Sequence, residues 1–185
     1  MWPFLNMARL FNILIILSEI PGFYIVLKKD GLKTFVYYTE IANLLVLISS
    51  LLFLLDPRGA ILLRYTSTCM LTLTFLVVVA VLGPIDGYKR QLLSENSFFQ
   101  HILAPVFSFI SYVFFEEHTQ IWSLPVMITL VYGALMFYLN YKKKIQGPYA
   151  FFDVHKQGIQ ASILWFIALM LVMSSVSVLI IVIAG

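Results

Sequence analysis

Charged side chains are scarce in this sequence. Only 11% of its 185 residues are Asp, Glu, Lys or Arg, and 61% are hydrophobic. A soluble globular domain has about a quarter charged residues and roughly half apolar ones. The chain therefore lacks the polar material that would cover a soluble surface, which predicts an integral membrane protein.

Cysteine and the common catalytic motifs are equally sparse. The single cysteine, Cys69, excludes an intrachain disulfide and a C-x-x-C motif, and its apolar surroundings favour a packing role. The sequence has no H-E-x-x-H, G-x-S-x-G or phosphate-loop motif. Its basic residues are scattered through short segments rather than gathered into a patch. We therefore expect no metal, no other cofactor and no nucleic-acid partner.

Long apolar runs make up most of what is present. Each is about 20 residues long, which suits a hydrocarbon core of roughly 30 Å. The expected spans are 7–27, 34–55, 60–82, 98–115, 121–141 and 159–184. They should be helices, because peptide groups in lipid need internal partners and the short alternating segments of barrel strands are absent. The prediction is an all-α integral membrane protein in which residues 1–185 form a single bundle of six transmembrane helices with short loops.

The beginning of the chain and its cations predict the topology. The first apolar run is too long for a cleaved signal peptide, so we expect a retained first helix. Nine cations follow the first, third and fifth spans: Lys28, Lys29, Lys33, Lys89, Arg90, Lys142, Lys143, Lys144 and Lys156. Three belong to the opposite side: Arg9, Arg58 and Arg64. By the positive-inside rule, the nine are expected in the cytoplasm and both termini outside. The short loops and the lack of a retained sorting signal favour a bacterial plasma membrane.

Some polar residues interrupt the apolar spans. Ionisable residues at membrane depth are costly and indicate function by default. At a rise of about 1.5 Å per residue, Thr39, His101 and Glu19 all fall in the cytoplasmic half of the bilayer. Glu40 lies beside Thr39, and Asn43 shares a helix face with Thr39 because the two are four residues apart.

The fourth span carries a second polar stripe. His101, Pro105, Ser108 and Tyr112 follow spacings of four, three and four residues. Polar faces in membrane bundles turn inward, so this stripe and the Thr39 face can meet. Ser108 and Tyr112 would then line a substrate channel.

These polar residues also have structural explanations. A threonine in a membrane helix commonly bonds a carbonyl three or four residues back, and a buried histidine often bonds a neighbouring helix. Glu40 can be solvated near the interface or paired with Lys33. Glu19 can anchor a polar side chain of another helix.

Three pieces of the sequence together resemble a known family. They are YYTEIANLLVLI (37–48), FFQHILAPVFSFISYVFF (98–115) and QGPYAFFDV (146–154). They are similar to the androgen-induced family of multi-pass membrane threonine hydrolases, which cleave fatty acid esters of hydroxy fatty acids, and most similar to its prokaryotic six-helix branch. The resemblance implies that Thr39 is the nucleophile and that His101 is its catalytic partner.

The implied chemistry agrees with the residue types. A threonine hydroxyl is a weak nucleophile that needs an adjacent base, and histidine is the usual base near neutral pH. The expected substrate is a lipid ester with a long acyl chain, which would enter from the surrounding lipid. Residues expected to support the reaction, as oxyanion donors or by orienting His101, are Asn43, Tyr38, Glu40, Glu19 and Asp153.

Two other classes of function remain open. The chain could be a small transporter or channel with a path through Glu19, Glu40 and His101. It could also be a non-catalytic protein that binds a partner in the membrane, with its basic loops against anionic headgroups. The sequence does not indicate an oligomeric state.

Overall fold

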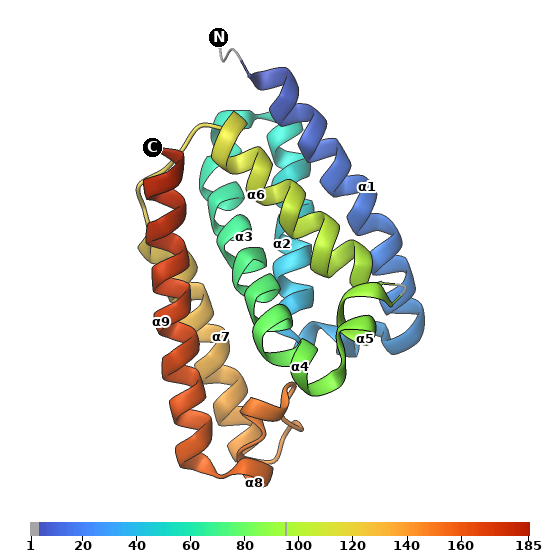
Figure 1. The fold of residues 1–185 in the computed structure, drawn as a ribbon, viewed down its shortest axis with the longest axis vertical. Helices are drawn as coiled ribbons and strands as arrows, with labels where there is room; N and C mark the ends of the chain where they lie inside the picture. Colours follow the sequence, from blue (N-terminus) through green and yellow to red (C-terminus); the bar gives the residue numbers. More distant parts are fainter. Residues whose placement is uncertain (1–3, 95) are drawn as a thin grey trace.

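The computed structural model describes residues 4–94 and 96–185. This part of the chain is helical with no strand, and six helices are long and apolar enough to cross a membrane. The prediction of an all-α bundle with six spanning helices is confirmed (Figure 1).

The spans are built from long helices and short extensions. The long helices are α1 (Leu5–Asp30), α2 (Tyr38–Leu55), α3 (Pro57–Val77), α6 (Ala104–Phe115), α7 (Ser123–Tyr141) and α9 (Ile159–Ala184). Two π-helical segments, η2 (Val78–Leu82) and η3 (Phe98–Leu103), continue α3 and precede α6. The connections contain the 3-10 helices η1 (Gly31–Val36) and η4 (Ala150–Phe152) and the short helices α4 (Gly83–Asp86), α5 (Tyr88–Leu93) and α8 (Val154–Gln157).

Local sequence explains where α2 and α3 begin. Gly31 has φ +59°, a left-handed conformation that suits glycine and ends α1. The following residues form η1, so α2 begins at Tyr38 and not at residue 34 as predicted. The α3 helix begins at Pro57, three residues earlier than predicted, because the Asp56 carboxylate accepts the Arg58 N–H at 3.2 Å and caps it.

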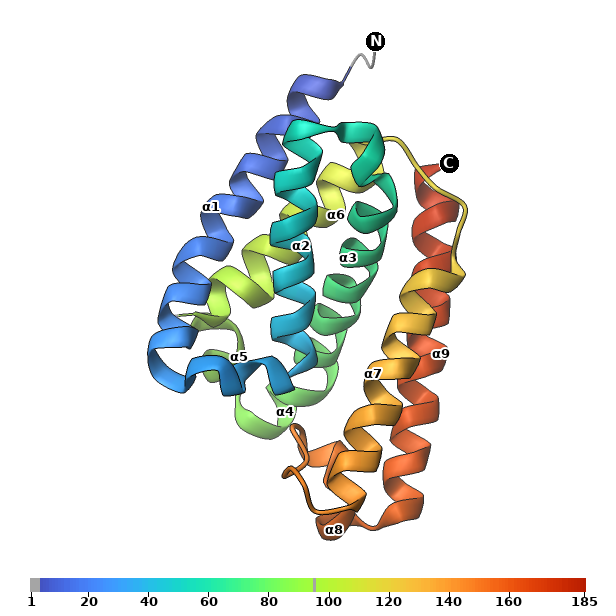
Figure 2. The ribbon, with the colours of Figure 1, turned by 180° about the vertical axis from the view of Figure 1, so that it is seen from behind.

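The helices form two groups (Figures 1 and 2). Helices α1, α2, α3 and α6 pack together, and the antiparallel pair α7 and α9 packs against α3. Both termini and the α2–α3 turn lie at one end of the bundle, whereas α4, α5 and α8 lie at the other. The loops after the first, third and fifth spans therefore share one end; their assignment to the cytoplasm stays a prediction.

A buried ion pair holds the four-helix group together. Arg64 is fully buried in α3, and its Nη2 lies 2.9 Å from Oε1 of Glu116, just beyond α6. Arg64 also donates to Ser50 of α2 at 3.1 Å, and the Asn12 amide of α1 donates to Glu116 at 3.0 Å. Arg64 was counted as a cation of the outer side, but it neutralises a carboxylate inside the protein and carries no information on topology.

Candidate functional site

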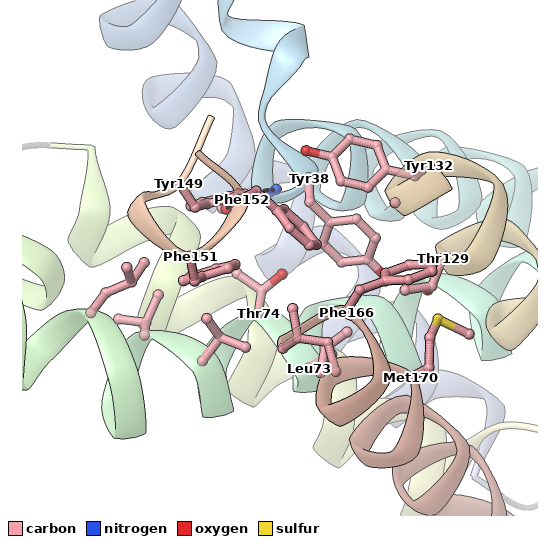
Figure 3. Close-up of a pocket in the computed structure, with 16 residues that line it drawn as sticks. Tyr38, Leu73, Thr74, Thr129, Tyr132, Tyr149, Phe151, Phe152, Phe166 and Met170 are labelled. Atoms are coloured by element: carbon pink, nitrogen blue, oxygen red, sulfur yellow. Dashed lines mark hydrogen bonds between the residues drawn. The ribbon is translucent and has the colours of Figure 1, made fainter. Parts of the chain in front are cut away.

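A pocket lies where the two helix groups meet. It lies between the start of α2, the end of α3, the α7 and α9 helices and the segment around η4 (Figure 3). Apolar side chains make up most of its wall, including Leu73, Phe151, Phe152, Phe166 and Met170. Such a wall suits a hydrocarbon chain.

The polar groups of the described lining are all hydroxyls. They belong to Tyr38, Thr39, Thr74, Thr129, Tyr132 and Tyr149. No charged side chain lines the pocket within the described part of the chain. These hydroxyls are hydrogen-bonded to protein groups, so the surface that the pocket offers to a ligand is almost wholly apolar.

Thr39 is held by Tyr149. The Thr39 hydroxyl oxygen lies 3.0 Å from the Tyr149 hydroxyl oxygen, and the Thr39 N–H donates to the same phenol oxygen at 3.3 Å. Thr39 lies in the first turn of α2, where backbone N–H groups lack intrahelical acceptors, so Tyr149 supplies one.

The phenol of Tyr149 is protonated near neutral pH. Burial raises the pKa of Tyr149 to about 12. Its oxygen accepts the Thr39 N–H, and either hydroxyl of the pair can donate to the other. When Tyr149 donates, Thr39 can give its own hydroxyl proton to another group.

Two further hydroxyls fix α7 against the start of α2. The Thr129 hydroxyl donates to the Pro125 carbonyl at 2.8 Å, so its oxygen accepts from Tyr38 at 2.7 Å. The Tyr132 hydroxyl donates to the Val36 carbonyl at 2.8 Å. Tyr38, a predicted oxyanion donor, lines the pocket with its hydroxyl engaged in this helix contact.

The QGPYAFFDV segment is shaped to present Tyr149. A Cβ on Gly147 would lie 2.6 Å from the Asp153 Cα, so only glycine fits there. The Asn140 side chain, at the end of α7, accepts from the Val154 N–H at 2.9 Å and donates to the Ile145 carbonyl at 3.2 Å. These contacts fold the segment back towards the pocket.

His101 has a different partner from Thr39. Its Nδ1 lies 2.7 Å from the Gln91 carbonyl oxygen in α5. Because a carbonyl only accepts, Nδ1 carries the proton of the neutral ring and Nε2 keeps its lone pair. Within the described part of the chain, no hydrogen bond joins His101 to Thr39, and His101 is not in the pocket wall. Their predicted catalytic partnership stays a prediction.

The residues predicted to line a channel lie elsewhere. Ser108 and Tyr112 are fully buried in α6 and are not part of the pocket wall. The Ser108 hydroxyl oxygen lies 2.7 Å from that of Thr68, and the Tyr112 hydroxyl accepts the Thr119 N–H at 3.2 Å. Both contacts are structural.

Asp153 also has another partner than the one predicted. Its carboxylate lies 3.3 Å from the Lys156 amine, which is one turn further along the chain. No hydrogen bond to His101 is formed within the described part. Its side chain is buried, and its backbone carbonyl accepts the N–H of Lys156 at 3.1 Å.

The predicted acidic residues gather between α1, α2 and η3. Glu40 is only 6% exposed and accepts a hydrogen bond from the Gln100 amide at 3.1 Å. It is neither solvated nor paired with Lys33; within the described residues it forms no ion pair. Glu19 and Asn43 are fully buried and lie outside the pocket wall, away from the oxyanion position predicted for Asn43.

Sequence reasoning missed two residues that organise these sites. Tyr149 lies within QGPYAFFDV but was not among the predicted site residues. Gln100 precedes His101, and an amide inside an apolar span was a usable signal. No protein family, curated protein or solved structure matches the chain, so its function is inferred from these residues and their geometry.

Proposed function

We propose that the protein is an intramembrane hydrolase of lipid esters in which Thr39 is the nucleophile and His101 the general base. The observation that carries the proposal is the Thr39 hydroxyl, which lies in the wall of an apolar pocket 3.0 Å from a protonated tyrosine. Fatty acid esters of hydroxy fatty acids are the substrates that the family resemblance implies.

The environment of Thr39 supports a role as nucleophile. The hydroxyl lies among apolar side chains that can hold an acyl chain. The hydrogen bond to Tyr149 fixes the position of the Thr39 oxygen, and when Tyr149 is its donor the Thr39 proton is available. A fixed attacking atom beside a bound substrate is a main source of rate enhancement.

The proposed reaction has two steps. The Thr39 oxygen attacks the ester carbonyl carbon while its proton passes to Nε2 of His101, and the resulting imidazolium then protonates the leaving alkoxide. This produces an alcohol and an acyl ester on Thr39. Water next attacks the acyl ester, His101 accepts a proton from the water, and that proton returns to Thr39 as the fatty acid leaves.

His101 must accept the Thr39 proton at its Nε2 atom. The Gln91 carbonyl selects the tautomer with a basic Nε2, which is the form a general base needs. His101 has no hydrogen bond to Thr39 in the resting structure, so Nε2 must reach the Thr39 proton through a water molecule or by approaching it when substrate binds. Catalytic hydrogen bonds commonly tighten only in the substrate complex.

Covalent labelling tests the proposal. Purified protein in detergent would be treated with a fluorophosphonate bearing a long alkyl chain, alongside Thr39→Ala, His101→Ala and Thr74→Ala. We expect labelling of the wild type and of Thr74→Ala, loss in Thr39→Ala, and a reduction of at least about 100-fold in His101→Ala. Thr74 is a matched control because it lines the same pocket while its hydroxyl donates to the Met70 carbonyl at 3.0 Å.

The other functional classes predict different results. Labelling that persists unchanged in both Thr39→Ala and His101→Ala, with intact folding, would reject the hydrolase. Binding of a fatty acid ester without turnover or labelling would indicate a lipid-binding protein. Mass spectrometry of the labelled peptide should find the modification on Thr39.

A further inference from the structure

We propose that Glu19, Glu40 and Asn43 form a buried binding site for a small monovalent cation such as Na⁺, between α1, α2 and η3. The site is separate from the Thr39 pocket and does not rest on the hydrolase proposal. Glu19 and Asn43 are fully buried, and Glu40 is 6% exposed.

Several buried polar atoms in this cluster have no hydrogen bond of standard geometry. Among the described residues they include both carboxylate oxygens of Glu19, although the Gln100 side chain lies close enough to interact with that carboxylate, and both polar atoms of the Asn43 amide. Three of these four atoms are acceptor oxygens and one is the amide nitrogen, a donor. Buried polar atoms are nearly always bonded to protein, water or an ion, so the three oxygens are candidate ligands of a cation.

Glu19, Glu40 and Gln100 lie close to one another. Glu19 and Glu40 lie near enough to interact electrostatically. Gln100 joins the two helices: its amide donates to Glu40 at 3.1 Å, and its Cγ lies 2.7 Å from where a Cβ on Gly22 would be. Gly22 follows Glu19 by three residues on one face of α1, so Gln100 fits against α1 beside Glu19.

Asn43 lies on the same face of α2 as Glu40, because it follows Glu40 by three residues. At about 1.5 Å per residue, Asn43 is roughly 4.5 Å deeper along the helix than Glu40, towards the level of Glu19. The unpartnered Asn43 oxygen can therefore serve as a further ligand beside the carboxylates.

The two carboxylates have no basic partner. Within the described residues, neither Glu19 nor Glu40 forms an ion pair; the exposed charged group that acts on Glu40 is Asp30, which is also acidic. Protonation would neutralise the carboxylates and turn one oxygen of each into a donor. A cation instead engages the carboxylate and amide oxygens at once, and a response only to acid would separate the first case from the second.

The available ligands favour a monovalent ion. The side chains offer about four oxygens: two from Glu19, one from Asn43 and the Glu40 oxygen that does not bond Gln100. Ca²⁺ takes six to eight oxygens, and Mg²⁺ retains several waters. Because these side chains are buried, they suit an ion that sheds its hydration shell more readily.

Thermal unfolding in detergent tests the site. The wild type would be titrated with NaCl against choline chloride at constant ionic strength, with KCl, MgCl₂ and CaCl₂ as further arms. We expect Na⁺ to raise the midpoint by about 2–4 °C and then to saturate, as binding to the native state requires. Glu19→Gln and Asn43→Ala should lose this shift, whereas the distant control Glu117→Gln should keep it.

Direct binding of radioactive sodium to the same proteins provides a second readout. We expect saturable binding to the wild type and to Glu117→Gln, and at least about a tenfold loss of affinity in Glu19→Gln and Asn43→Ala. Variants that remain monodisperse but bind like the wild type would overturn the proposal. It would also be overturned by a response only to acid, or only to divalent ions.

Discussion

The helix boundary at Tyr38 decides what the Thr39 hydroxyl can do. Thr66, Thr72 and Thr74 each donate to a carbonyl four residues back, at 2.7, 2.8 and 3.0 Å. Thr39 lies in the first turn of α2, so no preceding turn of that helix accepts its proton. Its hydroxyl bonds Tyr149 instead, and the expected backbone-bonded threonine is not formed.

Removing the Tyr149 hydroxyl should weaken the reactivity of Thr39 without abolishing it. Tyr149→Phe deletes the hydrogen bond to the Thr39 hydroxyl and also the acceptor of the Thr39 N–H. Loss of the bond to the hydroxyl corresponds to about a 3- to 10-fold slower labelling rate. Tyr37→Phe is the matched control, because Tyr37 is 43% exposed and packs edge-on against Tyr149 without lining the pocket. Equal rates in the wild type and in Tyr149→Phe would contradict a positioning role.

Tyr149 should not affect the pH dependence of labelling near neutral pH. The raised pKa of Tyr149, about 12, keeps its neutral form present at higher pH than in an exposed tyrosine. Between about pH 6 and 9, Tyr149 therefore does not change charge, and the pH profile of labelling should have the same shape in the wild type and Tyr149→Phe. An alkaline limb lost only in Tyr149→Phe would contradict this assignment.

At the scale of elements, Arg64 and Glu116 link α3 to the end of α6. Breaking such a buried pair leaves one charge without a partner and typically costs about 3–5 kcal/mol. We expect Glu116→Gln to lower the free energy of unfolding by that amount, as measured by denaturant titration in mixed micelles. Both side chains are almost completely buried, so solvent does not screen the loss.

Replacing both members of the pair shows whether stability is lost with the ion pair itself or through the buried charge left without a partner. Arg64→Met with Glu116→Leu removes both charges while keeping similar volumes, so most of the lost stability should return. Glu117→Gln, next in sequence to Glu116, is the control and should change stability little. If the double variant is as unstable as Glu116→Gln, the unpaired buried charge of Arg64 is not the cause of the lost stability.

The spans could be predicted from sequence, but several of their ends could not. Apolar runs of about 20 residues leave helices as the available structure in lipid, which explains why six were found correctly. The start of α2 was misplaced because residues 34–36 are apolar enough to continue a helix, although they form η1. Hydropathy does not distinguish a 3-10 turn from an α-helical one.

The site was only partly predictable because its key contact is long-range. Thr39 was marked as a polar residue in an apolar span, and the family resemblance implied its role as nucleophile. Tyr149 lies 110 residues away in a loop. Periodicity relates residues on one helix and says nothing about which loop returns to it. For the same reason, the residues that share a face of α2 or of α6 could be predicted. The hydrogen bond of His101 to the Gln91 carbonyl could not.

At the scale of the whole molecule, the two ends differ in charge. The connections that contain α4, α5 and α8 carry Lys89, Arg90 and Lys156, and both termini lie at the opposite end. We expect the C-terminus outside the cytoplasm. A phosphatase fused to it should be active and a fused green fluorescent protein dark; the reverse pattern would contradict the predicted orientation.

The Arg64–Glu116 pair also bears on how the chain enters the membrane. Glu116 follows Arg64 by 52 residues, so α3 is synthesised before its counter-ion exists. An arginine at the centre of a newly inserted helix costs about 2.5–3.5 kcal/mol, and less when its side chain reaches towards the interface. Arg64 lies seven residues after the first residue of α3, roughly 10 Å along the helix, which is within such reach. Pairing with Glu116 becomes possible only after α6 has been synthesised, so this buried contact forms after α3 has been made.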